Sequence, residues 1–416
     1  MASGTRELIK SSTIISVGVA LARVLGFGFS LVLARLLSPD DYGFIQYSLT
    51  LAGLVTLLTM PFGQHVLARY VGNVKDQPLE LDEFLATAWI ILIGLVAVTL
   101  VIAVPVLLLA GRLSVGVLVV FLGFTLHYSY FGLARGFMAS WRLMAAYLGS
   151  NVVQIIAIVI VYVVLGERGP MPALIIYGAS YLLPIGLLQL MQPFPVRFRF
   201  FLPDRAYVRR ILKFSAPVWV SHAAYIFYAG IDILLLERFL GTGAVGLYAL
   251  TKTLTMLLSF VPTGLTTVLL PKVAAGQGAS HRGLLRNSIL ISLMINALVL
   301  IVMLVAYRPF ILYVFGEAYV APLAVLVMLA FSEIAFGIQG IMSAVVVGAG
   351  QPQLETIMRV VVVGVSVVFG FVFIPTLGLT GAALTSLVGA ISGIVTYGLA
   401  SYWLKKDITH AAVEVR

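Results

Sequence analysis

The chain is dominated by apolar runs of about 20 residues, the length of helix that crosses the roughly 30 Å hydrocarbon core of a membrane. Hydrophobic residues make up 61% of its 416 residues and charged residues only 10%, whereas about a quarter of a soluble domain is charged. We therefore predict an all-α polytopic membrane protein with twelve transmembrane helices. The predicted spans are 12–34, 43–63, 84–108, 114–137, 147–166, 172–191, 212–236, 244–270, 285–306, 319–347, 357–375 and 380–403.

Basic residues are distributed unevenly between the two ends of these spans. With the N-terminus in the cytoplasm, 19 of the 26 Lys and Arg residues fall on the inner side and five on the outer side, while Arg23 and Lys252 lie within spans. Because basic segments resist translocation, this pattern predicts a multi-pass protein of the cell (cytoplasmic) membrane with both termini cytoplasmic. The net charge of +10 is then explained by topology, and we expect no nucleic-acid partner.

The sequence also contains an internal repeat. Residues 6–54 and 209–257 align without gaps and are identical at 13 of 49 positions, including the pairs Lys10/Lys213, Arg35/Arg238 and Gly43/Gly246. Each copy holds six predicted spans, so the copies have the same orientation, and parallel repeats of this kind place the substrate path between them. We predict two parallel six-helix halves, 1–200 and 201–416, around a central cavity, with transport by alternating access.

Four charged residues within predicted spans are the main candidates for function. They are Arg23, Asp232, Lys252 and Glu333. A charge at the bilayer centre costs roughly 2.5–3.5 kcal/mol on insertion scales, so such residues usually face a cavity or a partner. Polar stripes on the same spans add three candidates: Tyr248 lies one turn from Lys252, while Gln46 and His222 lie on similar stripes.

Each candidate has alternative roles. Arg23 and Lys252 make the predicted cavity cationic and suit a phosphate or diphosphate, but Arg23 alternatively pairs with a carboxylate and Lys252 alternatively snorkels to the surface. Asp232 either pairs with Lys252, holds a coupling cation or carries a proton. Glu333 is either a substrate or proton site or marks a helix break. His127 and His222 are expected to be interior histidines.

Enzyme motifs are absent from the sequence. There is no phosphate-binding lysine loop, no cysteine, and no His and carboxylate cluster with metal-ligand spacing. We expect no enzyme activity, no cofactor and no metal site, so transport would be driven by an ion gradient, the membrane potential or the substrate gradient.

Several motifs resemble those of one transporter family. They are Lys10-Ser-Ser with Arg23 and Gly26, the stretch from Leu33 to Gly43 (LARLLSPDDYG), Lys213-Phe-Ser-Ala-Pro217, Asp232, Gly246-Leu-Tyr248, Gly316-Glu-Ala-Tyr319 and Gly378-Leu-Thr-Gly-Ala-Ala383. With them the chain resembles the polysaccharide transporter, or oligosaccharide flippase (Wzx-like), family of the multidrug/oligosaccharidyl-lipid/polysaccharide (MOP) superfamily. The resemblance implies a MATE/MOP-like fold and a flippase for polyprenyl-diphosphate-linked oligosaccharide, in which Arg23 contacts the head group.

The resemblance also implies the partners. They are the lipid-linked oligosaccharide, the bilayer, and a polysaccharide polymerase or other assembly proteins, with the transporter itself expected to be a monomer. In a related group of lipid flippases, a sodium site uses a carboxylate that Asp232 matches, but span 11 offers no carboxylate or asparagine after Arg359. The alternative functions are a cation-coupled multidrug exporter of the same superfamily and a non-transporting scaffold for polysaccharide assembly.

Overall fold

A computed structural model describes Gly18 and residues 21–60, 64–191, 205–274, 281–348 and 352–414. The chain divides into two compact units, Met1–Ala223 (unit 1) and Ala224–Arg416 (unit 2). The division falls inside one long helix, α8 (Arg205–Leu240), which contributes to both units. The predicted halves, 1–200 and 201–416, were defined by the repeat and stay a prediction.

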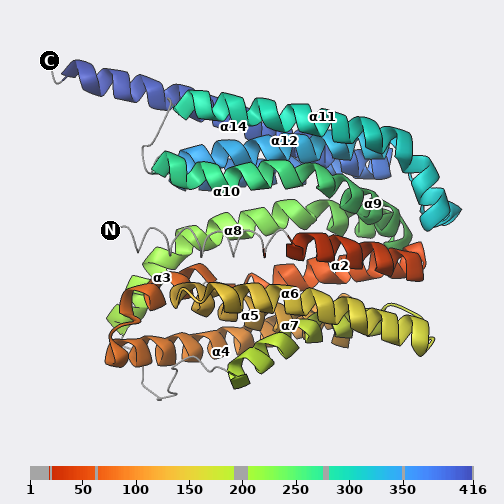
Figure 1. The fold of residues 1–416 in the computed structure, drawn as a ribbon, viewed down its shortest axis with the longest axis horizontal. Helices are drawn as coiled ribbons and strands as arrows, with labels where there is room; N and C mark the ends of the chain where they lie inside the picture. Colours follow the sequence, from red (N-terminus) through yellow and green to blue (C-terminus); the bar gives the residue numbers. More distant parts are fainter. Residues whose placement is uncertain are drawn as a thin grey trace. The chain divides into compact units, whose positions relative to one another are not determined.

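Unit 1 is built from helices. The described part of the first helix covers residues 21–36. The helices that follow are α2 (Pro39–Thr56), α3 (Gln64–Val74), α4 (Pro78–Leu109), α5 (Val115–Gly136), α6 (Ser140–Ile158) and α7 (Met171–Met191), and Figure 1 shows them in red to yellow-green. A π-helical segment, η2 (Val159–Val164), extends α6.

Unit 2 is likewise built from helices. After α8 come α9 (Thr242–Thr255), the 3₁₀ turn η3 (Met256–Ser259), α10 (Phe260–Ala274), α11 (His281–Val314), the 3₁₀ turn η4 (Glu317–Tyr319), α12 (Leu323–Gly348), α13 (Pro352–Leu377) and α14 (Leu379–Glu414). Figure 1 shows them in green to blue. Because α12 runs unbroken past Glu333, that residue does not mark a helix break.

Within the described ranges, ten helices are long and apolar enough to cross a membrane. They correspond to the third to twelfth predicted spans. Most of the N-terminal part of the first predicted span lies outside the described residues. In the second, α2 ends at Thr56 and is followed by a turn, while residues 61–63, before α3, lie outside the described part. Twelve spans are consistent with this structure.

The two units share one packing scheme. In unit 1, α5 packs against both α2 and α7; in unit 2, α12 packs against both α9 and α14. By position in the repeat, α5 corresponds to α12, α2 to α9 and α7 to α14. The fold therefore reproduces the sequence repeat as a repeated set of helix contacts.

Glycine allows the closest of these helix contacts. A Cβ atom on Gly123 of α5 would lie 2.5 Å from the carbonyl oxygen of Gly178 on α7, and a Cβ on Gly381 of α14 would overlap the carbonyl of Phe373 on α13. Small residues at helix interfaces are the usual means of packing membrane helices, since lipid provides no hydrophobic driving force between them. The glycines thus position α7 and α14 against their neighbours.

We expect Gly123→Ala to destabilise unit 1 by about 1–3 kcal/mol, because the added methyl group forces α5 away from α7. Thermal unfolding of the purified protein in detergent measures this change. Gly94→Ala is the matched control, since Gly94 is exposed on α4 and a Cβ added there would have no atom within 4 Å. Equal melting temperatures for the two variants would contradict the close-packing role of Gly123.

Candidate functional site: a charged cluster in unit 2

The Asp232 carboxylate is the centre of a polar cluster inside unit 2. Asp232 lies on α8 and is 1% exposed. Its Oδ2 atom accepts hydrogen bonds from Lys252 Nζ at 2.6 Å, Tyr248 Oη at 2.6 Å and Ser386 Oγ at 3.1 Å. Its Oδ1 atom accepts one from the Ile233 backbone N–H at 2.9 Å. Both carboxylate oxygens are therefore satisfied by protein donors.

Helix geometry explains how the partners of Asp232 converge. Tyr248 and Lys252 are four residues apart on α9, so they lie on one face of that helix, and Ser386 comes from α14. The Lys252 ammonium also donates to the Ala229 carbonyl at 3.0 Å and lies 5.7 Å from the centre of the Tyr248 ring. Three helices, α8, α9 and α14, thus meet at one ion pair.

Lys252 does not snorkel away from this cluster. Its side chain is 22% exposed, and its ammonium is held by Asp232 at 2.6 Å. A buried ion pair is tolerated when its remaining hydrogen bonds are satisfied, as they are here through Tyr248, Ser386 and two backbone groups. Among the alternatives for Asp232, the structure therefore shows the pair with Lys252.

Glu333 lies within electrostatic range of this ion pair. It is partly buried on α12, the helix that packs against both α9 and α14. The charges of Lys252 and Asp232 both act on its carboxylate. The ion pair itself joins Lys252 to Asp232, and with Glu333 the three groups carry a net negative charge when all are ionised.

The remaining predicted site residues belong to unit 1. Arg23 is exposed on the first helix. Gln46 is partly buried on α2. His222, on the part of α8 that belongs to unit 1, packs with its ring centre 6.4 Å from that of Tyr128. The structure brings together four of the candidates: Asp232, Tyr248, Lys252 and Glu333. That Arg23, Gln46 and His222 join them in one cavity stays a prediction.

One partner of Asp232 is not evident from the sequence. Ser386 is one of many small hydroxyl residues in the apolar spans, and no spacing marks it as a partner of Asp232. In unit 1, His127 is 4% exposed and surrounded by aromatic rings, with Tyr181 at 4.6 Å and Tyr147 at 5.4 Å between ring centres. The expected interior position of His127 is thus what the structure shows.

The arrangement of these helices is that of a known class of membrane transporters. An inward-facing multidrug resistance MATE family transporter of the MOP superfamily superposes with a TM-score of 0.68 at 18% identity, covering 93% of this chain and 98% of that one. The lipid II flippase MurJ, in an inward closed conformation, gives 0.65 at 14% identity, covering 94% and 87%. The Vibrio cholerae MATE transporter VcmN gives 0.63 at 17% identity, covering 97% and 98%.

These similarities establish the class: an all-α polytopic membrane protein with the MATE/MOP transporter fold, as the sequence predicted. A family model described as polysaccharide biosynthesis protein matches residues 8–277, and a MatE model matches residues 217–373. No curated protein matched the sequence. The chain belongs to the polysaccharide biosynthesis protein family, within the MOP superfamily of membrane transporters and flippases. Its matches are to transporters and flippases rather than to catalytic enzymes.

Proposed function

We propose that this protein is a flippase that moves polyprenyl-diphosphate-linked oligosaccharide from the cytoplasmic to the outer leaflet, for surface polysaccharide or glycoconjugate synthesis. The observation that carries the proposal is the match of residues 8–277 to the polysaccharide biosynthesis family. The two basic residues within predicted spans, Arg23 and Lys252, support it because the substrate head group is an anion.

In this proposal the halves move by alternating access and the two cations hold the diphosphate. The planar guanidinium of Arg23 binds phosphate oxygens in a bidentate manner, and the ammonium of Lys252 acts as a point charge. Lys252 is held by Asp232, but its ammonium has three N–H donors, so it can contact a phosphate with or without leaving that carboxylate. Asp232, Glu333 and His222 are proposed for coupling, and Tyr248 and Gln46 for contacts to the head group.

A cation-coupled multidrug exporter is the second candidate. The observation that favours it is the MatE match over residues 217–373, which contains Asp232 and Glu333. Asp232, Glu333 and Lys252 together carry a net negative charge when ionised, which suits an organic cation better than an anion. The flippase is preferred because its family model covers more of the chain and includes Arg23.

A transport assay distinguishes the two candidates. The protein is reconstituted in liposomes with a polyprenyl-diphosphate oligosaccharide, and exposure of the glycan to a membrane-impermeant glycosidase is followed over time. We expect protein-dependent exposure that fails with Arg23→Ala. No transfer across a panel of such lipids, together with export of an organic cation driven by a proton or sodium gradient, would establish the exporter instead.

The proposed orientation, with both termini cytoplasmic, is tested by single-cysteine labelling, which is simple because the chain contains no cysteine. Arg168→Cys, between the fifth and sixth spans, is expected to react with an impermeant maleimide added to intact cells. Lys75→Cys, on the opposite side in the predicted topology, is expected to react only after the membrane is permeabilised. The reverse pattern would invert the topology and with it the direction of transfer.

A further inference from the structure

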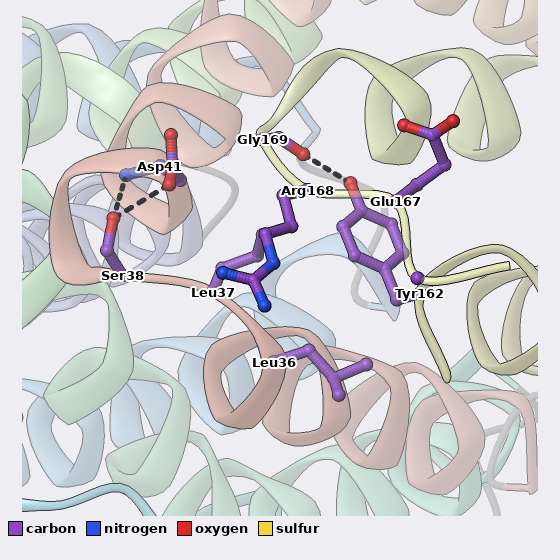
Figure 2. A pocket seen from close by; sticks show the side chains of 9 residues that line it. Leu36, Leu37, Ser38, Asp41, Tyr162, Glu167, Arg168 and Gly169 are labelled. Carbon is purple, nitrogen blue, oxygen red and sulfur yellow. Dashed lines mark hydrogen bonds between the residues drawn. The ribbon is translucent and has the colours of Figure 1, made fainter. Parts of the chain in front are cut away.

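Unit 1 contains a cleft of about 450 Å³ that is separate from the charged cluster around Asp232. Its walls come from two segments far apart in the sequence. One is the turn into α2, with Leu36, Leu37, Ser38 and Asp41, and the other runs from η2 into the loop before α7, with Tyr162 and residues 166–169 (Figure 2). The volume lies within the range of about 300–1,000 Å³ that is usual for small-molecule sites.

Both walls of the cleft are fixed by hydrogen bonds. Ser38 caps α2: its Oγ atom accepts from the Asp41 backbone N–H at 3.2 Å and donates to the Asp41 carboxylate at 2.8 Å. On the other wall, the Tyr162 hydroxyl donates to the Gly169 carbonyl at 2.5 Å and accepts from the Ala173 N–H at 3.2 Å. The cleft is therefore formed before any ligand arrives, which lowers the entropic cost of binding.

The groups in the cleft offer donors, an acceptor and apolar surface together. Figure 2 shows the Arg168 guanidinium reaching into the cleft toward Leu37, with Asp41 on the facing turn and the Glu167 carboxylate pointing away. Arg168 supplies hydrogen-bond donors only, whereas an ionised carboxylate such as Asp41 supplies acceptors only. The ring of Tyr162 and the leucines add the apolar part of the lining.

We propose that this cleft is a glycan subsite that binds a sugar unit of the lipid-linked oligosaccharide; the inference rests on the proposed function. A sugar hydroxyl both donates and accepts hydrogen bonds, so one ring can satisfy Arg168 and Asp41 at once while its C–H face packs on Tyr162 and Leu36. A phosphate is a poorer ligand, because the Asp41 carboxylate offsets the charge of Arg168 and repels an anion.

The position of the cleft fits a role late in transfer. Its two walls are the connections between the first and second spans and between the fifth and sixth spans. In an antiparallel succession of spans both connections lie at the same end, which is the outer end in the orientation proposed above. A glycan that passes toward the outer leaflet would meet this cleft while its diphosphate is still held at the cationic site.

Direct binding is tested first, with the full-length protein in lipid nanodiscs. The probes are neutral trisaccharides built from hexose and N-acetylhexosamine units, and their binding is detected by saturation-transfer NMR. We expect at least one to bind, and Arg168→Gln to weaken it about tenfold, since a hydrogen bond to a charged donor is lost. Arg308→Gln, at an exposed arginine of unit 2 that does not line the cleft, is expected to change nothing.

A second variant and a competitor make the outcome decisive. Leu36→Trp fills the cleft without removing a charge and is also expected to abolish trisaccharide binding. Inorganic pyrophosphate should leave binding unchanged. Displacement of the sugar by pyrophosphate would make the cleft an anion site and overturn the proposal, and so would the failure of every trisaccharide to bind the unmodified protein.

Transfer assays separate this inference from the proposed function. In liposomes, Arg168→Gln should slow the transfer of a polyprenyl-diphosphate oligosaccharide while leaving the same lipid with a single sugar unaffected. An equal loss for both lipids would overturn the glycan subsite and leave the flippase standing. If the unmodified protein transfers neither lipid but binds trisaccharide in the cleft, the flippase proposal fails and the sugar site stands.

Discussion

Asp232→Ala is expected to destabilise the protein by roughly 3 kcal/mol, a large fraction of the stability of a typical domain. The substitution removes the carboxylate that neutralises the largely buried Lys252 ammonium and that accepts hydrogen bonds from Tyr248 and Ser386. Removing one partner of a buried pair costs more than the pair itself contributes, because the other charge stays behind without compensation. The melting temperature in detergent, by tryptophan fluorescence, measures the effect.

A double variant separates charge compensation from function. Asp232→Leu combined with Lys252→Met removes both charges with side chains of similar volume, so we expect most of the lost stability to return. If Lys252 contacts the substrate, this stable double variant still fails to flip the lipid-linked oligosaccharide. Recovery of both stability and flipping would show that the pair is only structural. If the double variant is as unstable as Asp232→Ala, the uncompensated Lys252 charge is not the cause of the lost stability.

The matched control for this series lies on α13. Arg359 and Glu355 form an ion pair four residues apart on one helix, with side chains 30% and 18% exposed. Pairs of this kind contribute only about 0.3–0.5 kcal/mol, so Glu355→Ala is expected to lower the melting temperature far less than Asp232→Ala. Similar losses for the two variants would contradict a special role for the burial of Asp232.

The broad architecture was predictable because hydrophobicity dominates membrane folding. Runs of about 20 apolar residues set the spans, and ten helices within the described residues match the third to twelfth of them. The repeat was predictable from matched charges and glycines such as Arg35/Arg238 and Gly43/Gly246, and the helix contacts follow it. The interruptions after Thr56 and at Met256–Ser259 were not predicted, although the sequence marks both. Pro61 and Pro262 lack the N–H groups that would bond the carbonyls of Leu57 and Leu258 in a continuous helix.

The candidate site was predictable only in part. Their charge identified Asp232, Lys252 and Glu333, because a charged side chain in a membrane span is costly and usually faces a cavity or a partner. It did not specify that Ser386 of α14 completes the hydrogen bonds of Asp232, since that depends on which face of α14 meets α8. The cleft beside Arg168 was missed as well. One wall, Ser38 to Asp41, lies in the motif LARLLSPDDYG, but the segment that forms the other wall lies more than 100 residues away.

Arg23→Ala is expected to abolish flipping while leaving expression and folding intact. If the Arg23 guanidinium binds the substrate diphosphate, its removal costs a bidentate charged contact worth about 2 kcal/mol or more, or roughly 30-fold in binding. Folding should tolerate the change, because Arg23 is exposed and alanine favours the helix that spans residues 21–36. Transfer of the polyprenyl-diphosphate oligosaccharide in liposomes measures the loss, and the melting temperature reports folding.

Two companion variants identify the cause of that loss. Arg23→Lys keeps the charge but not the planar fork, so it should retain part of the activity. Arg35→Ala removes a second exposed arginine of the same helix, outside the predicted site, and should flip normally. Normal flipping by Arg23→Ala would mean that another cation holds the head group, whereas equal losses in Arg23→Ala and Arg35→Ala would point to a general effect of charge on membrane insertion. Loss confined to position 23, with partial rescue by lysine, is the result that only a head-group contact predicts.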